Sequence, residues 1–328
     1  MRFDLIIPTY NRSELLDRAL ASVDRATSPE GMTVRVTVVD NNSTDDTQSV
    51  VEAWGKRFAG SLTYLHETRR GRSSALNAGI SSTDGDIVGM IDDDEEICTQ
   101  WFVEAQRLFA REQIDFIGGP CLPRWGAERP DWLPKSYRGV IGWVENGDEE
   151  KPFDNSSPAI LTGGNSIIRR SVLERAGLFS TALGRTDKRL LSCEDEEFYH
   201  RLLATGARGR YTPGLVIYHY VPAERLTRRY HRSWCFWRAV SLGLLERQRK
   251  SDVAYLFGVP RYMFGNAVRG LLRYLSGPLT GVSKSDRFDG ELAAWDLAGI
   301  LYGRHFFRAE RSSDNKPIGK PSTALPGQ

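Results

Sequence analysis

The chain has 328 residues, of which 40% are hydrophobic and 26% are charged. This length and composition are typical of one large domain or two smaller ones, and they exclude a disulfide-stapled peptide or a wholly disordered chain. Lysine and arginine number 44 and acidic residues 42, so the net charge is only +2. Proteins dedicated to nucleic acids are usually strongly basic. We therefore expect no nucleic-acid partner.

Cysteine usage and hydropathy indicate where the protein works. The four cysteines show no paired spacing, and they are few for a secreted scaffold. The first residues, MRFDLIIPTYNR, contain too short an apolar run for a signal peptide. No apolar stretch is long enough for a membrane-spanning helix. These features favour a cytoplasmic protein whose membrane contact would be peripheral.

Strands and helices alternate over the first third of the chain. Short β-branched or apolar runs predict strands, and apolar residues three or four apart predict helix faces. The predicted strands are 3–7, 34–39, 62–65 and 87–91, and the helix faces that follow them lie in 15–23, 50–58, 73–80 and 101–109. Such alternation indicates an α/β fold with a parallel sheet covered by helices on both faces. Ligands of these sheets collect beyond the carboxyl ends of the strands.

The pattern is less regular in the second part of the chain. Pro, Trp and Gly are frequent from 120 to 158, where long loops are expected. Regular elements are predicted again as helices at 171–176 and 194–205 and as a strand at 215–219. Helical patterns then carry Arg beside aromatic residues from 225 onward. Residues 312–328 are polar with few apolar anchors and predict a disordered tail.

Five consecutive carboxylates, Asp92 to Glu96, directly follow the predicted strand 87–91. Adjacent negative charges repel one another, and a bound cation would relieve that repulsion. Carboxylate oxygens suit Mg²⁺ or Mn²⁺, and such ions commonly accompany phosphates. A solvated acidic loop is the alternative interpretation. The position at the carboxyl edge of the sheet favours the metal site.

Two more polar loops follow strands of the same sheet and should meet the acidic run at one edge. These loops contain Pro8, Thr9, Tyr10, Asn11 and Arg12 after the first strand, and Asp40, Asn41 and Asn42 after the second. Each residue alone is ordinary turn chemistry, but together the three loops predict a slot for a nucleoside diphosphate. Tyr10 would flank the base, and Asp40 would accept a hydrogen bond from it. Arg69 or Arg72 would bind phosphate oxygens.

Five motifs in this order resemble glycosyltransferase family 2. They are LIIPTYNR (5–12), VVDNNSTDDT (38–47), GRSSALNAGI (71–80), DGDIVGMIDDD (84–94) and GGNSIIRRSVLERAGLF (163–179), the last followed by Glu194 and Asp195. The resemblance covers about residues 3–220. It implies a GT-A fold, with a Rossmann-like, mostly parallel central sheet flanked by helices. It also implies an inverting mechanism, a nucleotide-sugar donor and a divalent metal, Mn²⁺ or Mg²⁺.

The same resemblance assigns roles to individual residues at the acidic run. The triplet would be the family's DxD element, in which Asp92 or Asp93 touches the ribose and Asp94 holds the metal on the diphosphate. Asp92 and His219 are further candidate ligands, although a lone histidine is more often explained by a structural hydrogen bond. The glycine pair that ends in Gly164 permits close backbone approach beside the donor sugar, and a tight turn is the alternative explanation.

Glu194 and Asp195 stand at the start of a predicted helix. Acidic residues are common in a first helical turn because they complement the helix dipole. The resemblance instead places this pair at the family's ED motif, whose aspartate is the usual catalytic base. Asp195 is therefore the predicted base, with Glu194 as the neighbouring candidate. It would take the proton of an acceptor hydroxyl that attacks the anomeric carbon.

Residues 225–275 hold eleven basic and two acidic side chains interleaved with Trp, Phe, Tyr and Leu. Arginine beside apolar residues at helical spacing is typical of a helix that lies on an anionic membrane surface. A basic helix packed on the catalytic domain is the alternative. Similar tails in relatives that act on lipid-linked saccharides favour membrane contact, at the inner face of the cell membrane.

The sequence thus predicts an inverting glycosyltransferase that uses a nucleotide sugar, most commonly a UDP-sugar, and a saccharide or lipid-linked saccharide acceptor in polysaccharide or glycan synthesis. The predicted regions are a catalytic domain (1–224) with a nucleotide-binding half (about 1–119) and an acceptor half (about 120–224), a basic, aromatic-rich helical extension (225–311) and the tail (312–328). One alternative is a sugar-nucleotide nucleotidyltransferase, which would carry a Gly-rich phosphate loop after the first strand. The other is a non-catalytic scaffold of a polysaccharide assembly.

Overall fold

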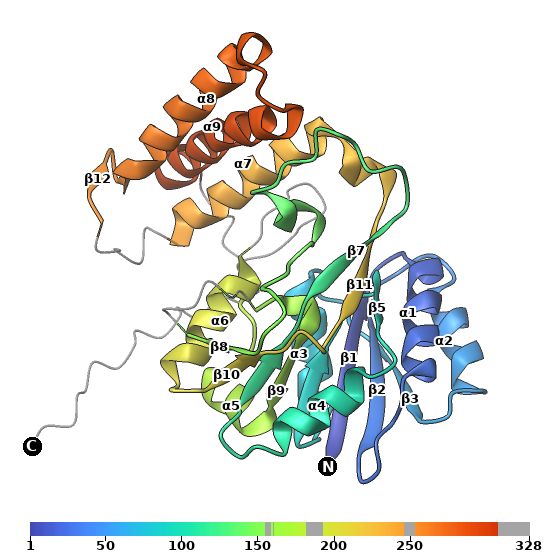
Figure 1. Ribbon diagram of the computed structural model, residues 1–328. Coiled ribbons are helices and arrows are strands. Elements are labelled where there is room, and N and C mark those ends of the chain that lie inside the picture. Colours follow the sequence, from blue (N-terminus) through green and yellow to red (C-terminus); the bar gives the residue numbers. More distant parts are fainter. Residues whose placement is uncertain (155–158, 160, 182–192, 246–252, 308–328) are drawn as a thin grey trace, which may run out of the picture.

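The structure is a computed structural model that describes residues 1–154, 159, 161–181, 193–245 and 253–307. The predicted tail, 312–328, and the last residues of the predicted extension, 308–311, lie outside this part of the chain. Figure 1 shows an α/β body that carries the amino terminus and a group of long helices stacked above it. The predicted helical extension is therefore present.

A large sheet forms the centre of the α/β body. Within the described residues it has eight strands in the order β3-β2-β1-β4-β9-β6-β10-β8, and four of its seven neighbouring pairs are parallel. The strands are β1 (Arg2–Thr9), β2 (Thr33–Asp40), β3 (Ser61–His66), β4 (Ile87–Met90), β6 (Phe116–Gly118), β8 (Lys151–Phe153), β9 (Ser166–Arg169) and β10 (Gly209–Tyr211). This topology confirms the predicted mostly parallel α/β fold.

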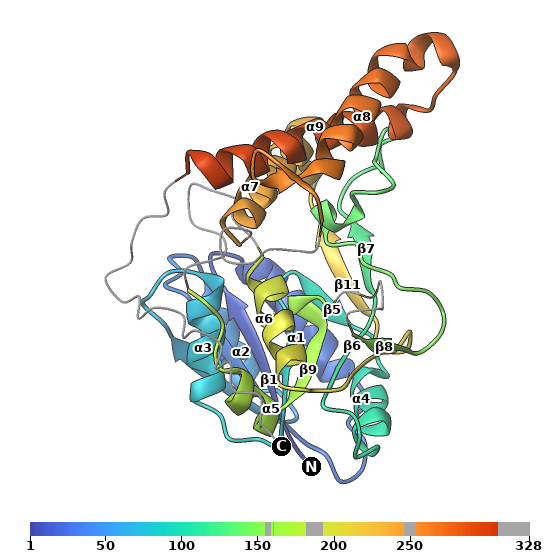
Figure 2. The same ribbon diagram turned by 90° about the vertical axis from the view of Figure 1, so that its left-hand side faces the viewer.

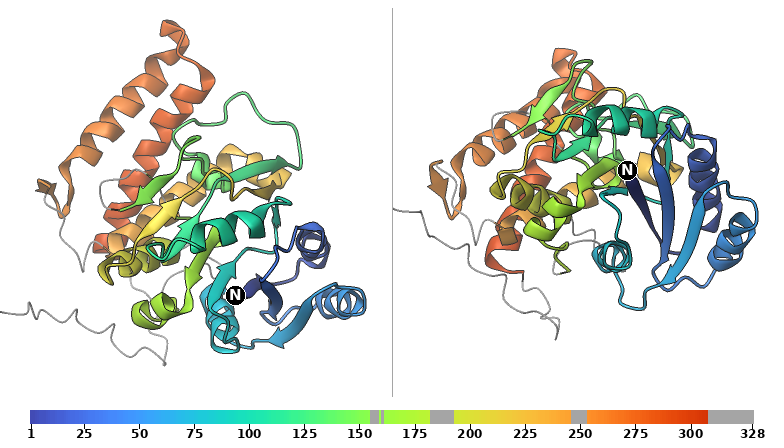
Figure 3. Two further views of the ribbon diagram at one scale, coloured as in Figure 1. Left: turned by 60° about the horizontal axis from the view of Figure 1, so that its bottom comes forward. Right: turned by 90° about the horizontal axis from the view of Figure 1, so that it is seen from below.

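Helices cover both faces of the sheet (Figure 3). Successive residues of β1 point to opposite faces, so that Leu5 and Ile7 join one hydrophobic cluster and Ile6 joins the other. The first cluster receives α1, α2 and α4, and the second receives α3, α5 and α6. Their bounds are α1 (Ser13–Arg25), α2 (Thr47–Gly55), α3 (Arg72–Ser81), α4 (Trp101–Phe109), α5 (Arg170–Ala176) and α6 (Glu194–Ala204). The apolar periodicity predicted all six helices correctly.

A smaller sheet brings distant segments to the acidic run. Its strands are β5 (Glu95–Ile97), β11 (Ile217–Val221) and β7 (Cys121–Trp125), with β11 in the middle. β11 begins two residues later than the predicted strand at 215–219. It pairs antiparallel with β5 in a register that places His219 opposite Glu95. This pairing carries His219 to the acidic run.

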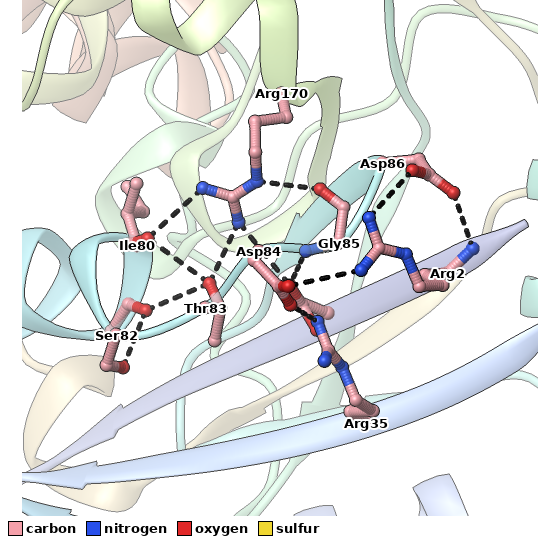
Figure 4. A network of polar contacts seen from close by, with 11 residues as sticks. Arg2, Arg35, Ile80, Ser82, Thr83, Asp84, Gly85, Asp86 and Arg170 are labelled. Atoms are coloured by element: carbon pink, nitrogen blue, oxygen red, sulfur yellow. Dashed lines mark hydrogen bonds and ion pairs between the residues drawn. The ribbon is translucent and has the colours of Figure 1, made fainter.

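A network of ion pairs joins the strands at the opposite end of the sheet (Figure 4). The Asp4 carboxylate is fully buried and accepts hydrogen bonds from Arg35 Nε at 2.7 Å and from the Gly85 backbone N–H at 2.6 Å. Arg170, the first residue of α5, donates to the Gly85 carbonyl oxygen. Leaving a buried charge unpaired costs about 3–5 kcal/mol, so this network ties β1, β2 and α5 together away from the acidic edge.

The helical extension packs around α9 (Lys284–His305), which lies against both α7 (Arg228–Leu245) and α8 (Arg261–Thr280). Gly270 of α8 and Gly290 of α9 meet backbone to backbone, and a Cβ on either glycine would overlap the other's carbonyl group. The β12 (Tyr255–Leu256) and β13 (Val259–Pro260) hairpin precedes α8. Among the described residues, no helix has the length and apolar character needed to cross a bilayer.

The first helix of the basic segment is packed against the rest of the protein. Cys235 of α7 and Phe288 of α9 are buried with Val140 from the loop region of the body. Arg232 forms a two-point ion pair with Glu291 at 2.6 and 3.0 Å. For residues 228–245 the structure therefore shows the packed basic helix, which was the alternative to membrane contact.

Candidate active site

A cavity of about 1480 Å³ opens where the carboxyl ends of the parallel strands face the helical extension. Its wall combines the loops after β1 and β4 with parts of α6, β11 and α7. The predicted site residues in this wall are Pro8, Thr9, Tyr10, Arg72, Asp92, Asp93, Asp94, Gly164, Glu194, Asp195 and His219. The acidic triplet and the Glu194–Asp195 pair, which are distant in the sequence, therefore share one cavity.

Three predicted nucleoside contacts, Asn11, Asp40 and Asn42, do not line the cavity. The Asp40 carboxylate accepts hydrogen bonds from the Ser43 backbone N–H at 2.8 Å and from the Tyr64 hydroxyl at 2.7 Å. Asn11 and Asn42 both adopt left-handed backbone conformations, with φ of 52° and 70°. These residues shape the loops after β1 and β2 without lining the cavity.

Asn41 lines the cavity in place of its two neighbours. It belongs to the polar loop predicted after the second strand, but the sequence pattern indicated no individual role for it. Its side-chain amide donates to the carbonyl oxygens of Glu67 at 3.0 Å and Arg69 at 2.7 Å. Its side-chain oxygen accepts from the Gly71 backbone N–H at 2.7 Å. Asn41 thereby holds the turn that leads into α3 and fixes where Arg72 begins that helix.

Arg12 and Thr9 hold the second carboxylate of the triplet. Arg12 Nη1 lies 3.0 Å from Asp93 and 3.1 Å from Asp94, and the Thr9 hydroxyl donates to Asp93 at 2.9 Å. Asp93 is only 4% exposed. Burial raises the pKa of Asp93 to about 6, against the opposing charge of Arg12. Asp93 thus joins the loop after β1 to the loop after β4.

Asp94 faces the smaller sheet and the start of the extension. Its carboxylate lies 3.5 Å from His219 Nε2 and accepts a hydrogen bond from Arg225 at 3.1 Å. Arg225 is buried and also contacts His219 Nε2 at 2.8 Å. Burial by itself would raise the pKa of Asp94, but His219, Arg225 and Arg12 hold it well below its ordinary value. Asp94 is therefore ionised throughout the physiological pH range.

Arg72 connects the triplet to the predicted base. Its Nε donates to Asp92 at 2.7 Å, and its Nη1 donates to Asp195 at 3.0 Å. Its buried Nη2 has no hydrogen-bond partner among the described residues, although it belongs to a side chain in the cavity wall. Since a buried guanidinium N–H is costly to leave unpaired, this atom is a ready donor for a bound anion.

Two glycines allow carboxylates to lie directly against the backbone. A Cβ on Gly163 would overlap the Asp195 carboxylate, and a Cβ on Gly164 would overlap the Glu95 carboxylate. The glycine pair in η2 (Gly163–Asn165) is therefore required by the acidic groups of both clusters. Burial, reinforced by the charges of Asp92 and Asp94, raises the pKa of Glu95 well above its ordinary value.

The first turn of α6 presents the predicted base to the cavity. Cys193, the residue before the helix, has φ of 78°, and the first turn contains four consecutive acidic residues, Glu194 to Glu197. Negative side chains are favourable there because the helix amino terminus carries partial positive charge. Glu194 is buried, and the Asp195 side chain is 35% exposed. The acidic first turn can therefore complement the helix dipole and present a base to the cavity at the same time.

The arginines are the main functional candidates that the sequence reasoning missed. Arg12 and Arg225 contact the triplet, and Arg238 of α7 lines the cavity beside Trp234. Arg12 was visible within the LIIPTYNR motif. The others lie in the basic segment, where the concentration of charge drew attention to a membrane and not to the site. The predicted alternative phosphate ligand Arg69 pairs with Glu67 and is absent from the cavity wall.

The model of glycosyl transferase family 2 matches residues 4–177, just over half of the chain. The chain belongs to glycosyl transferase family 2. This confirms the resemblance that five sequence motifs indicated, and with it the glycosyltransferase class of enzyme.

Two characterised relatives of the family align with much of the chain. The succinoglycan biosynthesis protein ExoM of Rhizobium meliloti is 24% identical over 233 residues, which are 69% of each protein. A GalNAc(5)-diNAcBac-PP-undecaprenol beta-1,3-glucosyltransferase of Campylobacter jejuni is 31% identical over 174 residues. That alignment covers 53% of each chain, so the match spans about half of the Campylobacter protein.

Solved structures of similar shape support the GT-A fold. The mannosyltransferase PcManGT of Pyrobaculum calidifontis, in complex with GDP-Man and Mn²⁺, superposes with a TM-score of 0.63 at 22% identity over 92% of this chain and 86% of that one. TarS 1-349 of S. aureus, in complex with UDP, gives a TM-score of 0.54 at 17% identity over 91% of both chains. At these identities the likeness shows the fold.

Proposed function

We propose that this family 2 enzyme transfers a sugar from a nucleoside diphosphate sugar to a hydroxyl group of a saccharide acceptor in one inverting step. The observation that carries the proposal is the shared cavity, in which the Asp92–Asp94 triplet and Asp195 are joined through Arg72. One carboxylate cluster would serve the leaving diphosphate, and the other would serve the attacking hydroxyl. An in-line displacement needs these two functions on opposite sides of the anomeric carbon.

The donor would lie along the loops after β1 and β4. Tyr10 is 42% exposed at the cavity and offers an aromatic face to the base, while the unpaired Arg72 Nη2 offers a hydrogen bond to the diphosphate. We propose a uridine nucleotide, for which the UDP complexes of TarS and GalNAc-T7 give support by analogy. PcManGT, in contrast, is in complex with a guanosine nucleotide, GDP-Man, so the donor panel described below tests which base this enzyme binds.

A divalent cation, Mn²⁺ or Mg²⁺, fits the chemistry at Asp94. Carboxylate oxygens and the His219 imidazole are suitable ligands, and His219 Nε2, which lies 3.5 Å from Asp94, is the ring nitrogen that would share an ion with that carboxylate. No three acidic, His or Cys side chains of the described part are grouped as a complete metal site. Asp92 faces Arg72, so Asp94 and His219 are the proposed ligands. On binding the ion, Asp94 would give up its contact with Arg12 or Arg225. The ion would supply positive charge beside the departing diphosphate.

The chain's own residues would then carry out the proton transfer. Asp195 would accept the proton of the acceptor hydroxyl as its oxygen attacks the anomeric carbon, and the nucleoside diphosphate would leave from the opposite face. Arg72 would orient the Asp195 carboxylate through the 3.0 Å hydrogen bond. Gly163 would leave room for that orientation.

The acceptor would enter from the side of the helical extension. Trp143 and Trp234 line this part of the cavity, and aromatic faces commonly pack on sugar rings. The names of the relatives concern succinoglycan synthesis and an undecaprenol-diphosphate-linked saccharide. By analogy we propose a saccharide or lipid-linked saccharide acceptor in cell-surface glycan synthesis, used by a protein of the cytoplasm at the inner face of the membrane.

A panel of nucleoside diphosphate sugars tests the proposal. The purified chain is heated with each donor, with and without Mn²⁺, because a ligand that binds the native state raises the unfolding temperature. A matching donor should shift this temperature and should release free nucleoside diphosphate on slow hydrolysis. Formation of nucleoside triphosphate and sugar 1-phosphate when inorganic diphosphate is added to the donor would instead indicate a nucleotidyltransferase. If no donor binds with or without metal, the proposed donor site is wrong, and the scaffold alternative is favoured.

A further inference from the structure

Exposed apolar side chains are concentrated on the outer part of the helical extension. Fourteen large hydrophobic side chains are exposed among the described residues, and nine of them lie between 253 and 279. Most of the nine belong to α8, the outer helix of the extension in Figure 1, which projects away from the α/β body in Figure 2. Contiguous exposed apolar surface of this kind commonly marks a contact with a membrane or a partner.

The exposed leucines of α8 form one continuous stripe. At the 100° turn of each helical residue, Val268, Leu271, Leu272, Leu275 and Leu279 fall within about a third of the circumference. Leu275 is 69% exposed and Leu279 is 91% exposed. The opposite side of α8 carries Ala267, Gly270 and Gly277, which are buried against α9. The protein thus already covers one side of this helix and leaves its more apolar side open.

The charge of α8 identifies the kind of surface that would cover this stripe. The helix carries Arg261, Arg269 and Arg273, and it contains no aspartate or glutamate. By helical position Arg261 stands in line with the leucine stripe and Arg269 stands beside it, where long side chains can reach a charged surface while the leucines enter an apolar layer; Arg273 is turned toward the side that packs on α9. A layer that is apolar inside and negatively charged at its boundary matches both features.

We infer that the apolar stripe of α8, flanked by its arginines, docks the enzyme on an anionic lipid bilayer. The leucines would lie in the headgroup and acyl boundary, and Arg261 and Arg269 would contact lipid phosphates. The contact is assigned to α8, because Arg228 and Arg232 of α7 already contact Trp132, Phe288 and Glu291 within the protein. The contact itself is argued from the side chains of α8. Its purpose, access to a lipid-linked acceptor in the same bilayer, rests on the proposed function.

Vesicle sedimentation of the whole chain tests the inference, with phosphatidylcholine vesicles and with vesicles that also contain phosphatidylglycerol. The wild-type chain should bind the anionic vesicles. Leu275→Glu should bind them about ten- to a hundredfold more weakly, the effect of burying one leucine less. Arg261→Gln with Arg269→Gln should weaken binding about thirtyfold on anionic vesicles and little on phosphatidylcholine. The matched control is Leu178→Glu, which changes an exposed leucine of the α/β body and should bind like wild type.

The same samples separate this inference from the proposed function. The unfolding-temperature shift given by a nucleotide sugar with Mn²⁺ should be equal in the wild type and in Leu275→Glu, because α8 does not line the cavity. Loss of that shift in every variant would affect the proposed donor and not the membrane contact. Absence of wild-type binding to anionic vesicles, or equal binding by Leu275→Glu, would overturn the inference. A dimer that Leu275→Glu dissociates, without vesicle binding, would also overturn it and identify a second copy as the occupant.

Discussion

Replacing Gly163 with alanine should disable the predicted base while leaving its carboxylate in the protein. A Cβ at this position would lie closer than 3.0 Å to the Asp195 carboxylate, which is held from its other side by Arg72 at 3.0 Å. The carboxylate would therefore have to leave both contacts. Misplacing a catalytic group by about 1 Å can cost about 100-fold in rate. We expect kcat to fall by about 100-fold, with little change in KM for the donor, because the proposed donor contacts lie on other loops.

Initial rates of transfer at saturating nucleotide sugar measure this effect. The matched control is Gly55→Ala, since no atom lies within 4 Å of a Cβ at Gly55, at the end of α2. This control should keep wild-type kcat and gain stability of up to about 1 kcal/mol from its better helix propensity. Circular dichroism establishes that both variants are folded. A folded Gly163→Ala enzyme with wild-type kcat would refute the role assigned to Asp195.

Three further sets of variants probe the cavity and the extension. Asp195→Asn should lower kcat by about 10²- to 10⁴-fold, the usual contribution of a general base, while the nucleotide affinity measured by calorimetry stays unchanged. Asp94→Asn should lower kcat by at least as much and should remove any stimulation by Mn²⁺. Metal-stimulated hydrolysis by Asp94→Asn would contradict the role assigned to Asp94. Arg72→Gln leaves Asp92 and Asp195 without their cation. Because both carboxylates are about a third exposed, the free energy of unfolding in urea should fall by about 1–3 kcal/mol, whereas a wild-type value would show that the pairs contribute nothing. Burial raises the pKa of Asp296 to about 6, so the stability linked to its protonated form is present at acid pH and is lost as pH rises through about 6. Asp296→Asn should remove that loss and be more stable than the wild type above neutral pH by on the order of 3 kcal/mol. If the wild type and the variant have the same pH profile of unfolding free energy, Asp296 titrates normally.

The helical extension contributes directly to the cavity as well as to the outer surface. Arg225, just before α7, contacts both Asp94 and His219, and Trp234 and Arg238 of α7 line the cavity. A truncation before this segment would therefore remove part of the site. The extension thus connects the proposed acceptor side of the cavity with the apolar stripe of α8.

The sequence by itself determined the order of the elements and the edge at which chemistry occurs. Apolar periodicity decides locally whether a segment becomes a strand or a helix, because it records which side of that segment is buried. The α/β fold, the six helices of the body and the acidic run after β4 followed from such local patterns. Motif order then indicated the family.

Only the tertiary structure decided which of those side chains meet. Asp40 follows a strand, as Asp92 does, yet its carboxylate turns to Ser43 and Tyr64, while Asn41 beside it reaches the cavity. Arg225 reaches Asp94 because β11 pairs with β5 in one particular register. The charge pattern of 225–275 likewise could not tell a buried arginine from an exposed one. Such contacts depend on the register and packing of distant segments, and a local pattern carries no information about them.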